Sequence, residues 1–282
     1  RYEVAQATGD WLWLLASDET TQGWAPANEV IPLDQAIERL TRLIEDNPKS
    51  VPHYLGRASI WWTEKHDLEK AIADYTEAIK LDPNNVNAYT NRGSAHAERR
   101  EFDQAISDYT TAIKLDLNSN EIDWLYIRRG IAYREKQEFD KAIADFNEAI
   151  RIAPYEVNGY YQRGRAAIDR EDYDQAIRDF SECIRLSPEN GVGNYVRGLA
   201  CYKHDEYEKA IADFTESLRI NPQDANVLQY RANAWYYISN FDNAISDYTE
   251  VAKIEPRNAD AIYWRGVSWT MKGEHQKAVA DY

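Results

Sequence analysis

The chain has 282 residues, a formal net charge of −15 and a hydrophobic fraction of 44%. An acidic chain repels phosphate backbones and anionic membranes, so we expect no nucleic-acid partner. No run of about 18 apolar residues occurs, so we also expect no membrane insertion. Two cysteines, Cys183 and Cys201, are too few for a disulfide framework or a cysteine-based zinc site.

Residues 1–32 differ in composition from the rest of the chain. The stretch "YEVAQATGDWLWLLAS" is rich in apolar and aromatic residues and has a turn signal at Thr8-Gly9-Asp10, which predicts short strands. "GDWLWL" and "GWAPANEV" resemble the last strands of a bacterial SH3-like domain, about half of which would be present. The other interpretation is a hairpin that caps the apolar end of a helical array; both can hold.

This resemblance implies a bacterial protein, because SH3-like modules of this kind are frequent in exported bacterial proteins. It leaves a cytoplasmic and an exported or periplasmic location open. The chain begins with Arg1 and carries only half of the SH3-like pattern, so we expect a piece of a longer protein. After it, "LDQAIERLTRLIEDNP" predicts one amphipathic helix, and residues 33–50 are interpreted as a degenerate half repeat or capping helix.

From residue 51 onward one phrase recurs with small changes, for example "FDQAISDYTTAIKLD" at 102–116 and "FDKAIADFNEAIRIAP" from Phe139. Its leading alanines are spaced by 34, 37, 34, 34, 34 and 34 residues. A fixed period of this size indicates stacked supersecondary units. The alanines are Ala71, Ala105, Ala142, Ala176, Ala210, Ala244 and Ala278.

Each period predicts two helices. In the unit that starts at Val86, positions 4, 8 and 11 lie on one helical face and include Tyr89 and Gly93. Positions 20, 24 and 27 predict a second amphipathic helix, with Ala105 and Tyr109, whose small residues permit close approach of the first helix. Proline at position 32 blocks continuation of the second helix. These prolines are Pro83, Pro154, Pro188, Pro222 and Pro256.

The pattern resembles the tetratricopeptide repeat family over residues 51–282. The resemblance implies an all-α, right-handed α-solenoid of tandem helix-turn-helix repeats, preceded by the small β-segment. The first repeat has one extra residue between its helices, and the second is followed by three extra residues around Asn120–Ile122, with Leu117 where proline is expected. Seven repeats are expected to start near residues 51, 86, 123, 157, 191, 225 and 259, the last one truncated.

Position 7 is arginine and position 23 is aspartate in every repeat. We predict that the two pair across the helix hairpin or to the neighbouring repeat, because a planar guanidinium suits a partly buried carboxylate. The alternative is a row of arginines that binds a ligand. The arginines are Arg57, Arg92, Arg129, Arg163, Arg197, Arg231 and Arg265; the aspartates are Asp74, Asp108, Asp145, Asp179, Asp213, Asp247 and Asp281.

The resemblance implies a concave groove lined by positions 2, 5, 9, 12 and 13 of each first helix. Of these 35 positions eight are aromatic and seven are charged, a composition typical of a protein-binding surface. Some of these aromatics are expected to pack against the next repeat instead. The candidate groove residues are Trp62, Trp124, Tyr161, Arg165, Tyr195, Tyr202, Asn233, Tyr236, Tyr237 and Tyr263.

The chain offers no recognisable catalytic constellation. Five histidines are scattered, no glycine-rich phosphate loop occurs, and the carboxylates lie on solvated helices, so we predict no enzyme activity, cofactor or metal. We therefore predict a scaffold that binds a partner peptide or helix. Two alternatives remain: the recognition arm of a larger enzyme or signalling protein, and self-association through the C-terminal repeat.

Overall fold

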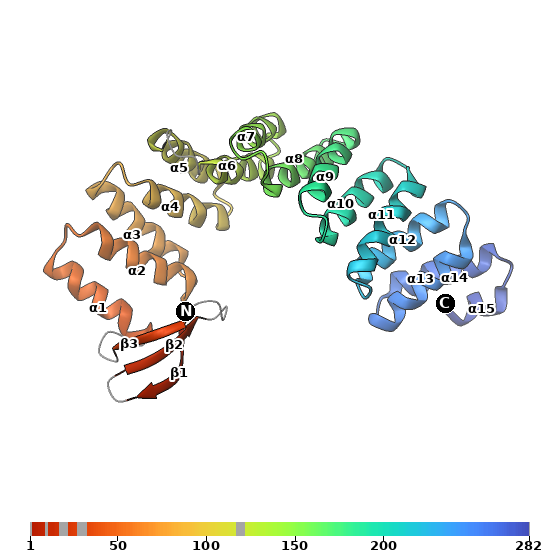
Figure 1. Ribbon diagram of the computed structural model, residues 1–282, viewed down its shortest axis with the longest axis horizontal. Coiled ribbons are helices and arrows are strands. Elements are labelled where there is room, and N and C mark those ends of the chain that lie inside the picture. Colours follow the sequence, from red (N-terminus) through yellow and green to blue (C-terminus); the bar gives the residue numbers. More distant parts are fainter. Residues whose placement is uncertain (1, 9–10, 17–21, 27–32, 117–121, 282) are drawn as a thin grey trace. The chain divides into compact units, whose positions relative to one another are not determined.

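The computed structural model describes residues 2–8, 11–16, 22–26, 33–116 and 122–281 (Figure 1). The chain divides into two compact units, residues 1–115 and residues 116–282. We call them the N-terminal unit and the C-terminal unit. The predicted insertion around Asn120–Ile122 and the Leu117 departure lie, apart from Ile122, outside the described residues.

The N-terminal unit starts with three strands, β1 (Tyr2–Thr8), β2 (Trp11–Ala16) and β3 (Gln22–Pro26). They form an antiparallel sheet in the order β1-β2-β3, with Val4 opposite Leu14 and Trp13 opposite Trp24. The turn signal at Gly9-Asp10 and the end of the "GWAPANEV" segment lie outside the described residues. The SH3-like interpretation of residues 1–32 therefore stays a prediction.

Five helices complete the N-terminal unit, each packed against the next one in the chain (Figure 1). The α2–α3 connection is one residue longer than the α4–α5 connection, which confirms the extra residue in the first repeat. The helices are α1 (Leu33–Asp46), α2 (Val51–Thr63), α3 (Leu68–Leu81), α4 (Val86–Glu98) and α5 (Phe102–Leu115).

The C-terminal unit consists of helical hairpins stacked in chain order (Figure 1). First helices also contact one another across the intervening second helix, as α6 does with α8 and α10 with α12. The helices are α6 (Asp123–Glu135), α7 (Phe139–Ile152), α8 (Val157–Asp169), α9 (Tyr173–Leu186), α10 (Gly191–Lys203), α11 (Tyr207–Ile220), α12 (Ala225–Tyr237), α13 (Phe241–Ile254), α14 (Ala259–Met271) and α15 (His275–Asp281). Within the described residues, no helix is both long and apolar enough to cross a membrane.

The hairpins share a turn whose geometry follows from backbone hydrogen bonding. After α4, Arg100 has a left-handed backbone (φ 62°). Its amide donates to the Ala97 carbonyl, and the Glu101 amide donates to the His96 carbonyl, both at 2.9 Å. This Schellman arrangement satisfies the last carbonyls and reverses the chain in three residues. The second helices end two residues before their prolines, as at Ile152 and Pro154, in agreement with the predicted stop signal.

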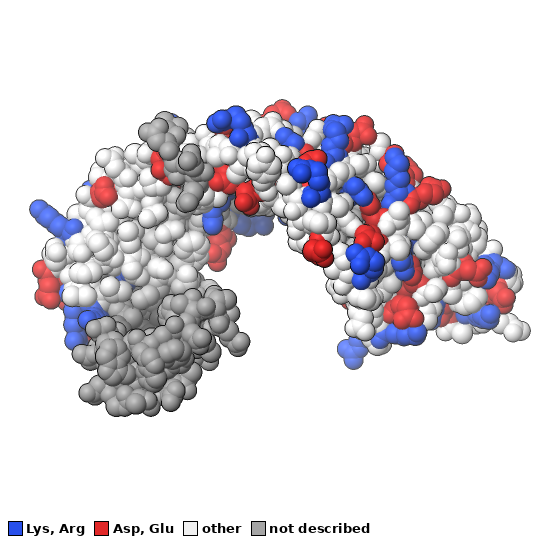
Figure 2. Space-filling view, in the orientation of Figure 1, with Lys and Arg blue, Asp and Glu red and all other residues white. Residues whose placement is uncertain are grey.

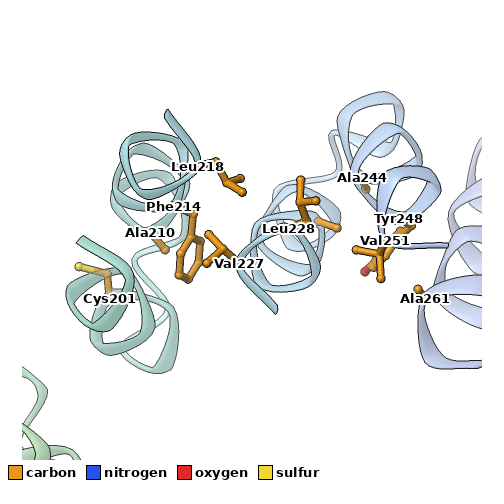
Figure 3. Packing of buried hydrophobic residues seen from close by; sticks show 11 residues of the cluster. Cys201, Ala210, Phe214, Leu218, Val227, Leu228, Ala244, Tyr248, Val251 and Ala261 are labelled. Carbon is orange, nitrogen blue, oxygen red and sulfur yellow. The ribbon is translucent and has the colours of Figure 1, made fainter. Parts of the chain in front are cut away.

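The core lies between the two helices of each hairpin and between consecutive hairpins. In Figure 3, Phe214 of α11 and Val227 of α12 point toward each other, and both are at most 1% exposed. Buried alanines such as Ala210 and Ala244 let the helices approach closely. Because each hairpin shares this apolar layer with the next, stability is distributed along the stack.

The predicted arginine–aspartate pairs all form, each within one helical hairpin. In the second repeat, Arg92 Nε donates to Asp108 Oδ2 at 2.9 Å and Nη2 donates to Oδ1 at 2.7 Å. The hydrogen bond to Asp108 raises the pKa of Arg92 above its ordinary value, against the opposing effect of burial. The same pairing joins Arg57 to Asp74, Arg129 to Asp145, Arg163 to Asp179, Arg197 to Asp213, Arg231 to Asp247 and Arg265 to Asp281.

Several of these arginines also reach the preceding hairpin. Arg92 Nη1 donates to Thr76 Oγ1 at 3.1 Å, and Arg197 Nη1 donates to Ser181 Oγ at 3.1 Å. Each such guanidinium therefore links the two helices of its own hairpin and ties that hairpin to the one before it. The structure favours the structural interpretation over a ligand-binding row of arginines, because the carboxylates occupy the Nε and Nη2 donors.

Both cysteines are 2% exposed and neither is in a disulfide. Burial raises the pKa of Cys183 to about 12 and that of Cys201 to about 11, from 9.0.

We expect neither thiol to react with Ellman's reagent in the native protein at mildly alkaline pH, and both to react in denaturant. A thiol pKa raised by folding stabilises the fold below pH 9, and that contribution is lost as the pH rises toward about 11. Rapid native reaction of either thiol would contradict the buried placement.

Candidate functional site

The candidate site lies in the C-terminal unit, on the surface formed by positions 2, 5, 9, 12 and 13 of its first helices, here called the first-helix face. In the C-terminal unit this surface exposes large apolar side chains from four helices. They are Trp124 of α6 (36% exposed), Val192 of α10 (47%), Tyr237 of α12 (53%), Tyr263 and Met271 of α14 (53% and 57%). Exposed apolar side chains that are grouped in this way are typical of protein-interaction surfaces.

The first-helix face opens into a cavity of about 140 Å³ between α10, α12, α13 and α14. We call this cavity the aromatic pocket. Four of its six lining residues were predicted as groove residues, and the structure brings those four together. The lining residues are Tyr202, Asn233, Tyr236, Tyr237, Tyr248 and Trp264.

The rings of the aromatic pocket stand nearly perpendicular to one another. The interplanar angle is 61° between Tyr202 and Tyr237, 79° between Tyr236 and Tyr237, and 66° between Tyr236 and Trp264. Their centroids are 5.3–6.0 Å apart, the range of favourable edge-to-face contacts. These contacts hold the rings in place as the walls of the cavity.

Polar atoms are held at the base of the aromatic pocket. The Tyr248 hydroxyl, on a side chain that is fully buried, donates to Asn233 Oδ1 at 2.7 Å. Gln229, one turn before Asn233 on α12, donates its amide to the same oxygen at 3.4 Å. Burial, followed by the neighbouring Tyr237 phenol, raises the pKa of Tyr202, so the Tyr202 hydroxyl stays protonated.

Three other candidate residues of the C-terminal unit lie outside the aromatic pocket. Tyr161 is half-buried, 6.2 Å from the Phe180 ring, and lines a separate cavity of about 230 Å³ beside Cys183. Arg165 is exposed, with its guanidinium 5.9 Å from the Tyr161 ring. Tyr195 packs against Phe214 at 6.4 Å, which is the packing role foreseen for some of the groove aromatics.

The remaining candidates differ in how far their side chains are exposed. Trp62, in the N-terminal unit, packs on the cluster around Tyr75 and donates its indole N–H to Glu98 at 2.7 Å. Trp124 is partly exposed, 5.5 Å from the Arg128 guanidinium. Tyr263 is exposed next to Trp264, with ring centroids 5.7 Å apart. The structure therefore does not gather all ten candidates into one site.

Tyr248 and Trp264 are pocket residues that the sequence prediction missed. They occupy positions 24 and 6 of their repeats, outside the groove positions. A signal for Tyr248 exists in the sequence: the second and sixth repeats carry tyrosine at position 24 and a polar residue at position 9. Asn233 pairs with Tyr248 in this way, and Ser94 lies 3.1 Å from the hydroxyl of Tyr109.

The side chains do not suggest a metal site. Within the residues that the structure describes, no group of three or more histidine, cysteine or carboxylate side chains is placed to hold a metal ion. His96 is engaged with Glu101 at 2.6 Å, and Asp205 accepts a hydrogen bond from Tyr207 at 2.5 Å. The arrangement of the first-helix face suits recognition through aromatic contact and amide hydrogen bonds.

Comparisons with known proteins agree with the observed architecture. The C-terminal part of a TPR repeat-containing protein from Cytophaga hutchinsonii superposes with a TM-score of 0.68 at 20% identity, over 82% of this chain and 93% of that one. YrrB, described as a TPR protein with an unusual peptide-binding site, superposes with a TM-score of 0.54 at 20% identity, over 68% of this chain and 97% of that one. At these identities the likeness shows the fold.

A curated relative is similar over one short segment. The UDP-N-acetylglucosamine–peptide N-acetylglucosaminyltransferase of Giardia intestinalis is 37% identical over 57 residues, which is 20% of this chain and 4% of that protein. The chain thus matches only a small fraction of that enzyme's length.

Models of repeat families match most of the chain. A "TPR repeat" model matches residues 63–99, and "Tetratricopeptide repeat" models match residues 86–119, 124–156, 161–225 and 231–282. These matches begin at residue 63 and do not extend to the N-terminal strands. Together with the stacked hairpins, they show that the chain belongs to the tetratricopeptide repeat family.

Proposed function

We propose that this chain is a non-catalytic scaffold that binds an extended peptide or a helix of a partner protein along its first-helix face. The observation that carries the proposal is the exposure of Trp124, Tyr237 and Tyr263 on three first helices of the C-terminal unit, α6, α12 and α14. Tyrosine and tryptophan contribute large contact areas at low cost in side-chain entropy. The fold itself is typical of proteins that interact with other proteins.

The distribution of charge bears on how a partner is recognised. Seven arginines are engaged in ion pairs inside the hairpins and do not reach a partner through their Nε and Nη2 donors. On the face of the C-terminal unit seen in Figure 2, acidic and basic side chains are interspersed. A partner is therefore expected to be recognised mainly by aromatic and hydrogen-bonding contacts.

Two comparisons bear on the kind of partner. YrrB is described as having a peptide-binding site, and its fold is shared over 68% of this chain. The similarity to a segment of a glycosyltransferase favours, as a second candidate, a recognition arm within a larger enzyme. The SH3-like interpretation of residues 1–32 stays a separate proposal, and groove binding does not depend on it.

Selection from a randomised peptide display library, followed by titration of the selected peptides, tests the proposal. We expect Tyr237→Ala combined with Tyr263→Ala to weaken binding about tenfold or more, because central aromatics are typical hot spots. Both side chains are 53% exposed, so the fold is expected to tolerate the change. The matched control is Tyr155→Ala, a tyrosine that is 80% exposed in the α7–α8 turn.

Equal binding by all variants would move recognition away from the first-helix face, and failure to select any peptide would remove the support for peptide binding. Light scattering on the same samples distinguishes binding of a partner from self-association through the last hairpin. A monomer that binds the selected peptides one to one agrees with the proposal.

A further inference from the structure

Some aromatic rings of the chain lie under one of its own cations, as Tyr89 does under Arg92 at 5.7 Å and Trp61 under Lys70 at 4.3 Å. In the described part of the chain, no such contact involves the rings of Tyr202, Tyr236, Tyr237 or Trp264. The chain's own cations therefore do not compete for the sides of these rings that border the cavity.

The arrangement of the walls suits a cation. Aromatic rings carry negative potential on their faces, and several rings around one space add their attraction for a positive group. The aromatic pocket has rings at 61–79° to one another and no arginine or lysine in its lining. Behind Tyr237 the Tyr207 ring is stacked at 4.8 Å, and the Tyr207 hydroxyl donates to the Asp205 carboxylate.

We propose that the aromatic pocket binds a basic side chain, lysine or arginine, from a partner segment that lies on the first-helix face. The inference rests on the proposed function and specifies its chemistry. The net charge of −15 on the chain complements a basic segment and increases its rate of encounter. Cation–π attraction at a partly desolvated site corresponds to a change of about tenfold in affinity.

The test uses the peptides selected with the intact chain. We expect one position of these peptides to carry lysine or arginine consistently. Replacing that residue by its uncharged analogue, norleucine for lysine or citrulline for arginine, should weaken binding about tenfold. Because the analogues keep nearly the same length and apolar stem, the loss reports the charge and not the contact area.

A matched set of protein variants locates the effect. Tyr237→Leu removes an exposed aromatic ring from the wall of the aromatic pocket, and Trp264→Leu removes a half-buried one. Each variant should bind the charged peptide and its uncharged analogue with nearly equal affinity. The control Tyr155→Leu should keep the full discrimination. Circular dichroism checks that each variant keeps its helices, and Tyr237→Leu remains decisive if Trp264→Leu unfolds.

The outcomes separate this inference from the proposed function. Peptides that bind the first-helix face with no preference for charge, or a preference that survives in Tyr237→Leu, would overturn the basic-residue pocket alone. Selection of peptides with an apolar residue at the conserved position would identify the pocket as an apolar one instead. If no peptide binds the chain, both proposals fail together.

Discussion

Replacing Asp179 by alanine is expected to lower the free energy of unfolding by about 3–5 kcal/mol, because it leaves a guanidinium without its partner inside the protein. The Asp179 side chain is 2% exposed and that of Arg163 is 19% exposed. Asp179 accepts hydrogen bonds from Arg163 Nη2 at 2.6 Å and from Gln175 Nε2 at 3.1 Å. Urea denaturation followed by circular dichroism measures the loss.

A double-mutant cycle distinguishes the stability lost by leaving a buried charge unpaired from the stability lost by removing a contact. Arg163→Met combined with Asp179→Ala should be more stable than Asp179→Ala alone, since no buried charge is left unpaired, and Arg163→Met alone completes the cycle. The surface pair of Arg185 and Glu182, with side chains 57% and 40% exposed, is the control. Glu182→Ala should change stability by no more than about 0.5 kcal/mol. Additive effects in the cycle would contradict coupling between Arg163 and Asp179.

Gly130→Ala is the second substitution with a large expected effect, a loss of about 1–3 kcal/mol. Alanine normally stabilises a helix interior by about 1 kcal/mol relative to glycine, so the loss must come from packing. A Cβ atom at Gly130 would lie 2.5 Å from Phe146 Cε1. The Phe146 ring is 0% exposed and cannot move aside without disturbing the hairpin.

Gly56→Ala is the matched control for this prediction. A Cβ atom at Gly56, also inside a first helix, would meet Leu40 Cδ2 at 3.7 Å, an ordinary contact distance. We therefore expect a gain of up to about 1 kcal/mol from helix propensity. Opposite signs for the two substitutions, measured by denaturation, support the close approach at Gly130. A gain in both would show that Phe146 relaxes freely.

The regular features of the fold could be predicted from the sequence because they recur. The period specified where helices alternate, and the co-occurrence of arginine at position 7 with aspartate at position 23 identified the ion pairs. Small residues such as Gly130 and Ala142 marked the close approach of paired helices. Each of these depends on contacts inside one hairpin, which the repeat pattern fixes.

The candidate site was harder to predict from the sequence. The role of an aromatic residue at a groove position depends on its neighbours in the next hairpin. Trp62 and Tyr237 both occupy groove positions, but Glu98 takes the indole N–H of Trp62 whereas Tyr237 stays exposed. Trp264 lies outside the groove positions and still lines the pocket. Such differences between repeats depend on individual residues that vary from one repeat to the next, so the repeat period does not predict them.

Site-specific photo-cross-linking tests the central claim most directly. A benzophenone amino acid is placed at Tyr237, on the first-helix face, or at Arg178, an exposed position on the second helix α9. With a selected peptide bound, we predict efficient cross-linking from position 237 and none above background from position 178. Cross-links from the second helix with none from position 237 would contradict partner binding at the first-helix face.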